Sequence, residues 1–516
     1  MSEAAGSGDD TDFSVMSGSA LWIAGIVLAL ANFMVVLDTT IANVSVPNIA
    51  GGLAVSPSQG TWVITSYAVA EAITVPLTGW LAQRFGAVRV FVFAVAGFGV
   101  CSMLCGFAPS FGALVGLRVL QGLSGGPIMP LSQTLLRRIF PPQQQAMAIG
   151  LWSMTTVVGP VAGPLLGGTL VDGVGWPFIF FINIPVAALC AIVAWRFLAS
   201  RETKTVRNPV DFTGLALLIL WIGAMQIMLD NGKDLDWFNS PVIVTLALVA
   251  AVGFVSFLIW ELTDPHPIVD LKVFRHRGFA TSTLIMALVF GAFFSSIVLM
   301  PLWLQTNLGY NATWAGRAVA PQGIFAVLLS PIVARMSTRV DGRILVSFGV
   351  TVLGLASLWR SGFAPDIDVF QVSLPQVLQG AAVPFFFIPI TGLALGSVLP
   401  RETASAAGLM NFTRTTAAAF GTSITTTAWQ NFASIHRTNL VGSLNGPQAT
   451  LDSLKAGGLT AAQALGQLDR MTDSQSVMLA TDHVFLICAV VFIMGACAVW
   501  IAPRLQLSGQ PVAGGH

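Results

Sequence analysis

The chain has 516 residues, of which 55% are hydrophobic and only 9% are charged. Soluble proteins carry roughly 25% charged residues, so this composition excludes an ordinary water-soluble domain. The formal net charge of +1 gives no reason to expect a nucleic-acid partner. Several apolar runs reach the roughly 20 helical residues that cross a bilayer. These runs are continuous rather than short and alternating, which favours helices over a β-barrel and predicts an all-α polytopic membrane protein.

Fourteen apolar spans can be placed in chain order, separated by breaks that carry Gly, Pro and charge, such as SPSQG, FPPQQQ and TDPHP. An even number of spans places both termini on one side of the membrane, with tails at 1–19 and 506–516. The predicted spans are 20–46, 58–82, 87–106, 109–136, 145–170, 176–197, 212–229, 239–261, 279–306, 315–335, 342–360, 370–397, 403–429 and 482–503.

The basic residues agree with this count. When the N-terminus is placed inside, sixteen Lys and Arg residues fall in inside segments and five in outside segments. Because cytoplasmic loops of membrane proteins are enriched in Lys and Arg, we predict a multi-pass protein of the cytoplasmic (inner) membrane with both termini in the cytoplasm. The outside five are Lys233, Arg360, Arg437, Lys455 and Arg470, while Arg118, Arg317 and Arg414 lie in or near spans.

The longest outside segment is 430–481, which is rich in Gln, Asn, Ser, Thr and Ala. Within it, the stretch 460–470 can form a short helix. Two interpretations stay open for this segment. It is either a solvated loop, or a lid or docking surface for a periplasmic partner.

The sequence repeats itself at an offset of 258 residues. Several matches at one offset predict two homologous halves of six spans each, with spans seven and eight as an insert. The predicted parts are a first half at 20–200, an insert at 201–265 and a second half at 266–505. Parallel halves with a site between them are a transporter arrangement. The matches are RVLQG at 118–122 with QVLQG at 376–380, Gly150-Leu151 with Gly408-Leu409, and Gly163 with Gly421.

Four segments carry a resemblance to a known family: LDTTIANVSVP at 37–47, GWLAQRFGAVR at 79–89, RVLQG at 118–122 and GPVAGPLLGG at 159–168. They resemble motifs of the major facilitator superfamily, in its fourteen-span drug:proton antiporter branch. The segments SQGTWVITSYAVA, FIFFINIP and NFTRTTAAAFGTSITTT are similar to EmrB-type multidrug efflux permeases. Together the resemblance runs from about Phe33 to Trp429. One departure is Gln83, where the family's loop motif usually has an acid.

This resemblance implies the major facilitator fold and a proton-coupled antiporter that exports hydrophobic or amphipathic drugs. Protons are the coupling ion, and neither another cofactor nor a metal is expected. EmrB-type permeases work as inner-membrane subunits of tripartite pumps, which implies a periplasmic membrane-fusion adaptor (EmrA-type) and an outer-membrane channel (TolC-type) as partners. The alternative on the same fold is a dedicated exporter of one metabolite, such as a fatty acid or a siderophore.

Three ionisable residues inside apolar spans are the candidates for proton coupling: Asp38, Glu71 and Arg118. A charge inside a membrane span is costly, so such residues face a cavity or a partner and mark proton or substrate pathways. By resemblance, Arg118 is the motif residue tied to proton transfer. The bland alternatives are a static Asp38–Arg118 ion pair and, for Glu71, a hydrogen-bonded seam between helices.

A second group consists of candidates for the lining of a substrate cavity. Tyr67, Glu71, Thr74 and Thr78 recur at helical spacing, which predicts one polar face. Arg414, in span thirteen, either meets an acid across the interface or reaches out to the membrane surface, and the sequence does not decide between them. The remaining candidates lie within or beside the motifs: Thr39, Asn43, Trp62, Trp152, Met154, Asn411 and Phe412.

Two motifs predict moving parts. In span five, Gly159, Gly163 and Gly167 recur every four residues, followed by Gly168, and form a smooth ridge for close helix approach. Pro160 and Pro164 permit a bend there, and the resemblance makes this segment a conformational hinge. The loop after span two is the predicted cytoplasmic gate and contributes Gly79, Arg84, Gly86 and Arg89.

Enzyme chemistry has few candidate residues in this sequence. The chain contains no P-loop, no HExxH motif and no nucleophile elbow. We therefore predict a transporter and not an enzyme.

Overall fold

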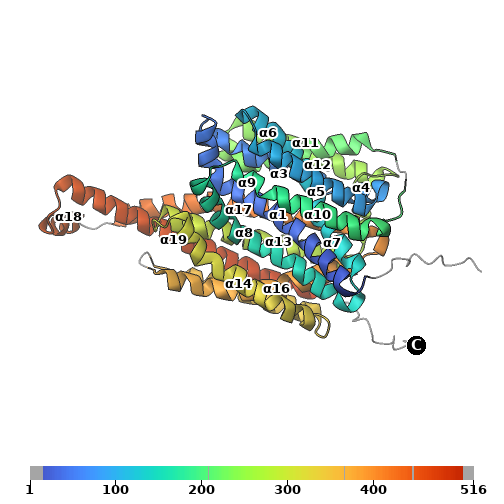
Figure 1. Cartoon of the computed structure of the whole chain (residues 1–516). Coiled ribbons are helices and arrows are strands. Elements are labelled where there is room, and N and C mark those ends of the chain that lie inside the picture. Colours follow the sequence, from blue (N-terminus) through green and yellow to red (C-terminus); the bar gives the residue numbers. More distant parts are fainter. Residues whose placement is uncertain (1–15, 207–208, 365–366, 444–446, 504–516) are drawn as a thin grey trace, which may run out of the picture.

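The computed structural model describes residues 16–206, 209–364, 367–443 and 447–503, which form helices joined by turns, with no strand among them (Figure 1). The predicted first half holds α1 (Gly18–Gly52), α2 (Pro57–Gly60), α3 (Trp62–Thr74), α4 (Thr78–Phe85), α5 (Ala87–Gly106), α6 (Phe111–Gly125), α7 (Ile128–Ile139), α8 (Gln145–Gly173), α9 (Phe178–Phe181) and α10 (Asn183–Leu198). The insert consists of α11 (Phe212–Asn231) and α12 (Pro241–Thr263). The second half holds α13 (Arg277–Thr306), α14 (Ala312–Met336), α15 (Gly342–Arg360), α16 (Val369–Gly396), α17 (Thr403–Ser443), α18 (Pro447–Ala456) and α19 (Ala461–Ala498).

Short 3₁₀ segments complete the helical structure of the described chain. They are Pro142–Gln144, Ala199–Arg201, Trp237–Asn239, Leu271–Arg275, Pro400–Glu402 and Val499–Ile501.

Ten helical segments in the described residues are long and apolar enough to cross a membrane. They include α1, α5, the α9–α10 segment, α11 to α16, and α19. Helices also occupy the other four predicted ranges, 58–82, 109–136, 145–170 and 403–429, but these do not belong to the ten. The chain is thus a polytopic all-α membrane protein, and the count of fourteen crossings stays a prediction.

Three of the predicted spans are divided between α-helices. The span 176–197 has a single-residue break between α9 and α10, and the other two break near a proline. In the range 58–82, α3 gives way to α4 around Pro76, and in the range 109–136, α6 gives way to α7 at Pro127. Proline lacks the backbone N–H that continues a helix, which explains both breaks. Thr78, predicted on one face with Tyr67, therefore begins a separate helix.

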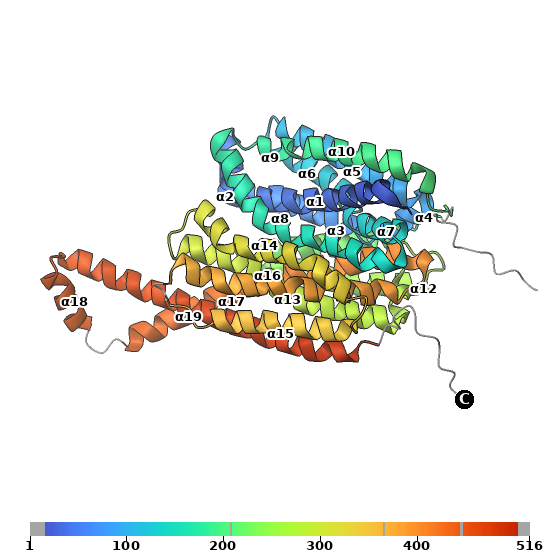
Figure 2. The ribbon, with the colours of Figure 1, turned by 60° about the horizontal axis from the view of Figure 1, so that its bottom comes forward.

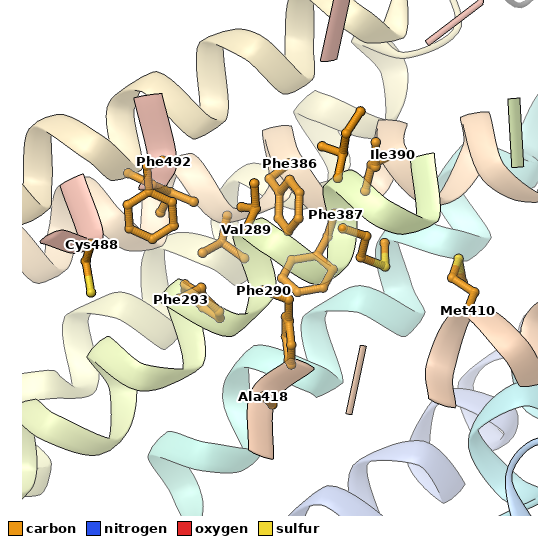
Figure 3. Close-up of a cluster of buried hydrophobic side chains, with 14 of the residues drawn as sticks. Val289, Phe290, Phe293, Phe386, Phe387, Ile390, Met410, Ala418, Cys488 and Phe492 are labelled. Carbon is orange, nitrogen blue, oxygen red and sulfur yellow. The ribbon is translucent and has the colours of Figure 1, made fainter. Parts of the chain in front are cut away.

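The two halves form two layers. Figure 2 shows the helices α1 to α10 in one layer and α13 to α17 with α19 in the other, with the described chain beginning and ending at the same end of the bundle. We call this the tail end, and the opposite end, from which α18 projects, the hairpin end. Inside the second layer, Phe290 and Phe293 of α13 face Phe387 of α16, with ring centroids 5.5 and 6.1 Å apart (Figure 3).

The repeated glycines take equivalent places in the two halves. A Cβ atom at Gly163 of α8 would lie 2.2 Å from the hydroxyl of Thr40 on α1. A Cβ atom at Gly421 of α17 would lie 2.6 Å from the carbonyl oxygen of Gly291 on α13. Each glycine thus lets the fifth span of its half pack closely against the first.

The insert lies along the seam between the halves, with α11 against α3 and α17. Two hydrogen bonds fasten the hairpin end of the insert to α17. Trp237 Nε1 donates to Thr427 at 3.0 Å, and the Ser423 hydroxyl donates to the carbonyl of Leu229, near the end of α11, at 3.0 Å. The seam on this side is therefore covered by protein.

The segment 430–481 is not a loop with one short helix. Instead, α17 continues to Ser443 and α19 begins at Ala461, so both helices extend beyond the bundle and α18 lies at the far end (Figure 1). Arg437 of α17 joins the two arms through ion pairs with Asp469 at 2.7 Å and Asp473 at 2.6 Å. We call residues 430–443, 447–456 and 461–481 the hairpin extension.

Candidate transport site

A buried polar network surrounds Asp38 in the middle of α1, whose side chain is almost completely buried. Its Oδ2 accepts a hydrogen bond from Arg118 Nη1 at 2.6 Å. Its Oδ1 accepts one from Gln121 Nε2 at 3.1 Å and one from Asn183 Nδ2 at 2.7 Å. The helices α1, α6 and α10 thus converge on one carboxylate, and the Arg118 charge makes its burial tolerable.

Arg118 also binds the start of the broken second span. Its Nε donates to the carbonyl of Val63 at 2.9 Å, and its guanidinium carbon lies 4.2 Å from the centre of the Tyr67 ring. Its Nη2 is buried without a hydrogen-bond partner. Asp38 and Arg118, two of the predicted coupling residues, therefore form a buried ion pair. This arrangement fits both the coupling role and the alternative of a static ion pair.

Glu71 and Arg414 connect this network to the second half. Glu71 lies half-buried on α3, one turn after Tyr67, and interacts electrostatically with Arg118 and with Arg414. Arg414 comes from α17 and is buried, so it does not reach the membrane surface. Among the described residues it forms no ion pair, and its Nε lacks a hydrogen-bond partner.

Aromatic and sulfur groups from both halves enclose the Arg414 side chain. Its Nη2 donates to the sulfur of Met129 at 3.4 Å. Its guanidinium carbon lies 5.3 Å from the Trp152 ring of the first half and 5.2 Å from the Phe290 ring of the second. Such contacts stabilise a cation through the negative faces of the rings.

Two further predicted residues lie at this interface. Asn411 of α17 donates from Nδ2 to Gln133 Oε1 of α7 at 3.0 Å, which links the halves directly. Trp152 is oriented by a hydrogen bond from its Nε1 to the hydroxyl of Ser132 at 2.9 Å. Sequence reasoning did not single out Met129 or Gln133, since α7 carries no motif.

Other predicted cavity residues do not join this group. Phe412 packs against Trp221 of the insert, with ring centroids 5.8 Å apart, because it lies on the opposite side of α17 from Arg414. Trp62 and Asn43 are exposed, and Met154 is half-buried. The hydroxyls of two threonines bond to their own helices: Thr39 to the carbonyl of Val35 at 3.0 Å and Thr74 to that of Ala70 at 2.6 Å.

The predicted hinge glycines divide into two groups. A Cβ atom at Gly159 would lie 2.4 Å from Val36 of α1, and Gly163 makes the similar approach described above. At Gly167 the closest α1 atom is 3.5 Å away, and at Gly168 nothing lies within 4 Å. Close packing thus involves the first two glycines, while α8 continues as one helix through Pro160 and Pro164.

Within the predicted gate loop, Gly79 touches the other half. A Cβ atom there would lie 2.7 Å from the Cα atom of Ser405 on α17. The second half makes the reciprocal contact, since a Cβ atom at Gly408 would lie 2.9 Å from the carbonyl oxygen of Val75. Both contacts bring backbones together near the tail end.

Another part of that loop contacts Glu202, at the beginning of the insert. Gly86 has a φ of +95°, which favours glycine, and a Cβ atom there would lie 2.3 Å from the Glu202 carboxyl carbon. Glu202 accepts hydrogen bonds from the backbone N–H groups of Val88 and Arg89, both at 2.9 Å, at the start of α5. Glu202 thus provides a carboxylate to this loop, in which Gln83 occupies the position where the family's motif usually has an acid. Arg84 lies over the Trp80 ring at 5.5 Å.

One basic residue was placed wrongly from the sequence. Arg360, assigned to an outside segment, is the last residue of α15 and is buried. Its Nη1 donates to the Ser296 hydroxyl at 2.7 Å, and its Nη2 donates to Gln376 at 2.9 Å and also to Gln379. These four residues form a second polar network that sequence reasoning missed.

Comparisons with known proteins identify the family. The pattern of the Major Facilitator Superfamily matches residues 28–422. The chain belongs to this superfamily. It is therefore a transporter rather than an enzyme, and its sequence is of the EmrB type.

Relatives match nearly the whole chain. It is 44% identical to the multidrug export protein EmrB of Escherichia coli K12 over 506 residues, covering 97% of this chain and 99% of that protein. It is 43% identical to the fatty acid resistance protein FarB of Neisseria gonorrhoeae over 509 residues, covering 98% and 100%. The solved structure of the proton:xylose symporter XylE superposes with a TM-score of 0.58 at 13% identity, covering 94% and 96%, which shows the fold alone.

Proposed function

We propose that this chain is a proton-coupled antiporter that exports hydrophobic or amphipathic drugs across the cytoplasmic membrane. The kinship to multidrug export proteins supports the class of cargo. The observation that carries the coupling is the buried ion pair of Asp38 with Arg118 at 2.6 Å. Glu71, one turn after the Tyr67 ring that lies against Arg118, is a second carboxylate, and it interacts electrostatically with Arg118 and with Arg414 of the second half.

A proton on either carboxylate would change how the halves attract each other. Protonated Asp38 no longer holds Arg118, and protonated Glu71 no longer attracts Arg414 of the second half. Because buried charges are costly unless they are paired, such a change alters the relative stability of conformations that differ in these contacts. A bound cationic or neutral drug would compete for the same carboxylates and aromatic rings.

The test uses inverted membrane vesicles energised to an acidic interior. Drug addition is expected to release protons in the wild type and not in Asp38→Asn. Glu261→Gln is the matched control, because Glu261 is a buried carboxylate of the insert, away from this site. Proton release in wild type and in Asp38→Asn alike would move the coupling to Glu71, to be tested with Glu71→Gln. The absence of release in the wild type with every drug of a broad panel would contradict proton-coupled drug export.

We also propose that both termini lie in the cytoplasm of an inner membrane and that the hairpin extension projects outside. It is the contact for a periplasmic adaptor of the EmrA type, which connects to a TolC-type channel. Support comes from the projection of α17 and α19 and from exposed apolar side chains along it, including Ile435, Val441, Leu465 and Met471. Deletion of Pro447–Ala456 is expected to reduce drug resistance in cells while drug-dependent proton flux in vesicles persists. Equal loss in both assays would refute the docking role.

The 43% identity to FarB favours one specific alternative, export of a fatty acid by the same fold. A substrate panel in cells separates the two. Resistance to several chemically unrelated drugs supports the multidrug exporter, and protection from fatty acids alone supports the alternative.

A further inference from the structure

The two buried polar networks occupy equivalent positions in the two halves. The second consists of Ser296, Arg360, Gln376 and Gln379, which lie 258 residues after Asp38, Ser102, Arg118 and Gln121 respectively. This offset is the one that relates the halves. Each network also has a phenylalanine ring beside its cation: Phe180 lies 5.6 Å from the Arg118 guanidinium and Phe485 lies 5.5 Å from that of Arg360.

The networks differ in one essential respect, which is the counter-ion. In the first half the carboxylate of Asp38 faces Arg118. In the second half Ser296 takes the place of Asp38, and the cation belongs to α15 instead of the helix equivalent to α6. Among the described residues, no carboxylate forms an ion pair with Arg360, and its Nε has no hydrogen-bond partner. A fully buried, unpaired cation is unusual in a protein interior and calls for an anion.

A pocket between the halves lies against the position of the missing carboxylate. It is lined by Ser296 and Gln376, which are both partners of Arg360, by Gln322 of α14, and by Pro160 of the hinge motif on α8. The amide nitrogens of Gln322 and Gln376 are buried and have no hydrogen-bond partner. Because Gln376 uses its oxygen to accept from Arg360, its amide N–H groups remain available to donate.

The polar groups of this pocket are thus mostly donors. Ser296 uses its oxygen as the acceptor for Arg360, so its hydrogen is also available. Donors that surround a positive charge fit an anionic oxygen group and not a cation. The free space is about 20 Å³, roughly the room of one water molecule, so the carboxylate enters only when the halves shift.

We propose that this pocket binds the carboxylate group of amphipathic organic acids, which supply the counter-ion that Arg360 lacks. The apolar part of such an acid extends along the interface past Pro160, so that binding engages the hinge helix. The inference rests on the proposed export function and assigns acidic cargo, of which a fatty acid is one example, a binding site of its own, separate from Glu71.

Binding of a matched pair of probes tests the proposal. Naphthaleneacetate and its neutral amide have the same ring system and differ in charge. With the full chain in phosphatidylcholine nanodiscs, calorimetry is expected to show tighter binding of the acid. Arg360→Gln should weaken binding of the acid by roughly 10- to 100-fold, the range for loss of charge-assisted hydrogen bonds, and change that of the amide less than about twofold. Arg360→Lys should keep most of the preference.

Arg317→Gln is the matched control, because it removes the same charge from an exposed position of α14 that does not line the pocket. It should leave both affinities unchanged. An equal loss for acid and amide in Arg360→Gln, or no preference for the acid in the wild type, would overturn the proposal. Blocking of the acid by added phosphatidylglycerol would assign the pocket to a lipid phosphate and overturn it as well. Drug-dependent proton release, measured separately in Arg360→Gln with a cationic drug, reports on the export function independently.

Discussion

Asp38→Asn is expected to destabilise the folded chain through the loss of one buried counter-ion. Asparagine keeps the shape of the side chain, so packing is unchanged. The asparagine amide, however, replaces one carboxylate oxygen by an NH₂ group, which cannot accept a hydrogen bond. This group would face another donor in either orientation: Arg118 at the Oδ2 position, or Gln121 and Asn183 at the Oδ1 position. Removal of one partner from a buried ion pair costs about 3–5 kcal/mol, because the remaining charge stays buried and uncompensated.

The equivalent arginine of the second half provides the contrast. Arg360→Gln loses hydrogen bonds worth roughly 1 kcal/mol each, but it also removes an unpaired buried charge. We therefore expect a smaller loss of stability, below about 2 kcal/mol. Unfolding titrations with sodium dodecyl sulfate in mixed micelles measure both variants against the wild type.

A double-mutant cycle isolates the pair. Asp38→Asn and Arg118→Gln should each be costly alone, while the double variant should recover a coupling energy of about 2 kcal/mol or more. Additivity within about 0.5 kcal/mol would refute the reasoning, since it would show that the two charges do not stabilise each other. An Asp38→Asn cost no larger than that of Arg360→Gln would refute it too.

Three other predictions concern packing, backbone and pH. Gly163→Ala should destabilise the chain by about 1–3 kcal/mol, because its Cβ would collide with α1, whereas Gly168→Ala has open space and should be neutral in the same unfolding assay. Gly86→Ala should cost about 1–3 kcal/mol through its positive φ and the adjacent Glu202, visible as a lower thermal midpoint in detergent. Burial and a neighbouring histidine lower the pKa of His436 in the hairpin extension, so the folded form binds its proton less readily than the unfolded form. The stability from neutral His436 is present above the unfolded pKa of about 6.5 and is lost as pH falls. After correction for the slower intrinsic exchange at low pH, the protection factors of the extension's amides should fall on acidification, and His436→Gln should remove this dependence.

Apolar periodicity predicted the helical architecture well, because lipid imposes long helices and leaves few alternatives. The helix α15 has the bounds expected for its span, and α5 likewise. The breaks at Pro76 and Pro127 were not predicted, since proline is tolerated in membrane helices and its presence does not fix a break. Of the hairpin extension only the helix at 460–470 was predicted, because the segment resembles a loop in its polar composition.

At the site, the chemistry of single residues was easier to predict than their partners. A carboxylate and an arginine inside apolar spans each need a partner of opposite charge or a hydrogen bond, and Asp38 and Arg118 do form an ion pair. The sequence could not show that Arg414 faces rings and sulfur, because these come from helices far apart in the chain. Arg360 was misplaced because it ends its span, although the 258-residue offset from Ser102 contained the signal. The placement of Arg360 used only its charge and its position at the end of a span, and not the repeat that relates the two halves.

At the tail end the two halves meet through backbone, with Gly79 against Ser405 and Gly408 against the carbonyl of Val75. Neither contact involves a charge, and dissolved salt, which screens exposed ion pairs beyond about 10 Å at 0.1 M, leaves such contacts unchanged. Separation of the halves at these two contacts exposes small side chains and peptide groups. These two contacts should therefore keep their strength when the ionic strength of the surrounding solution changes.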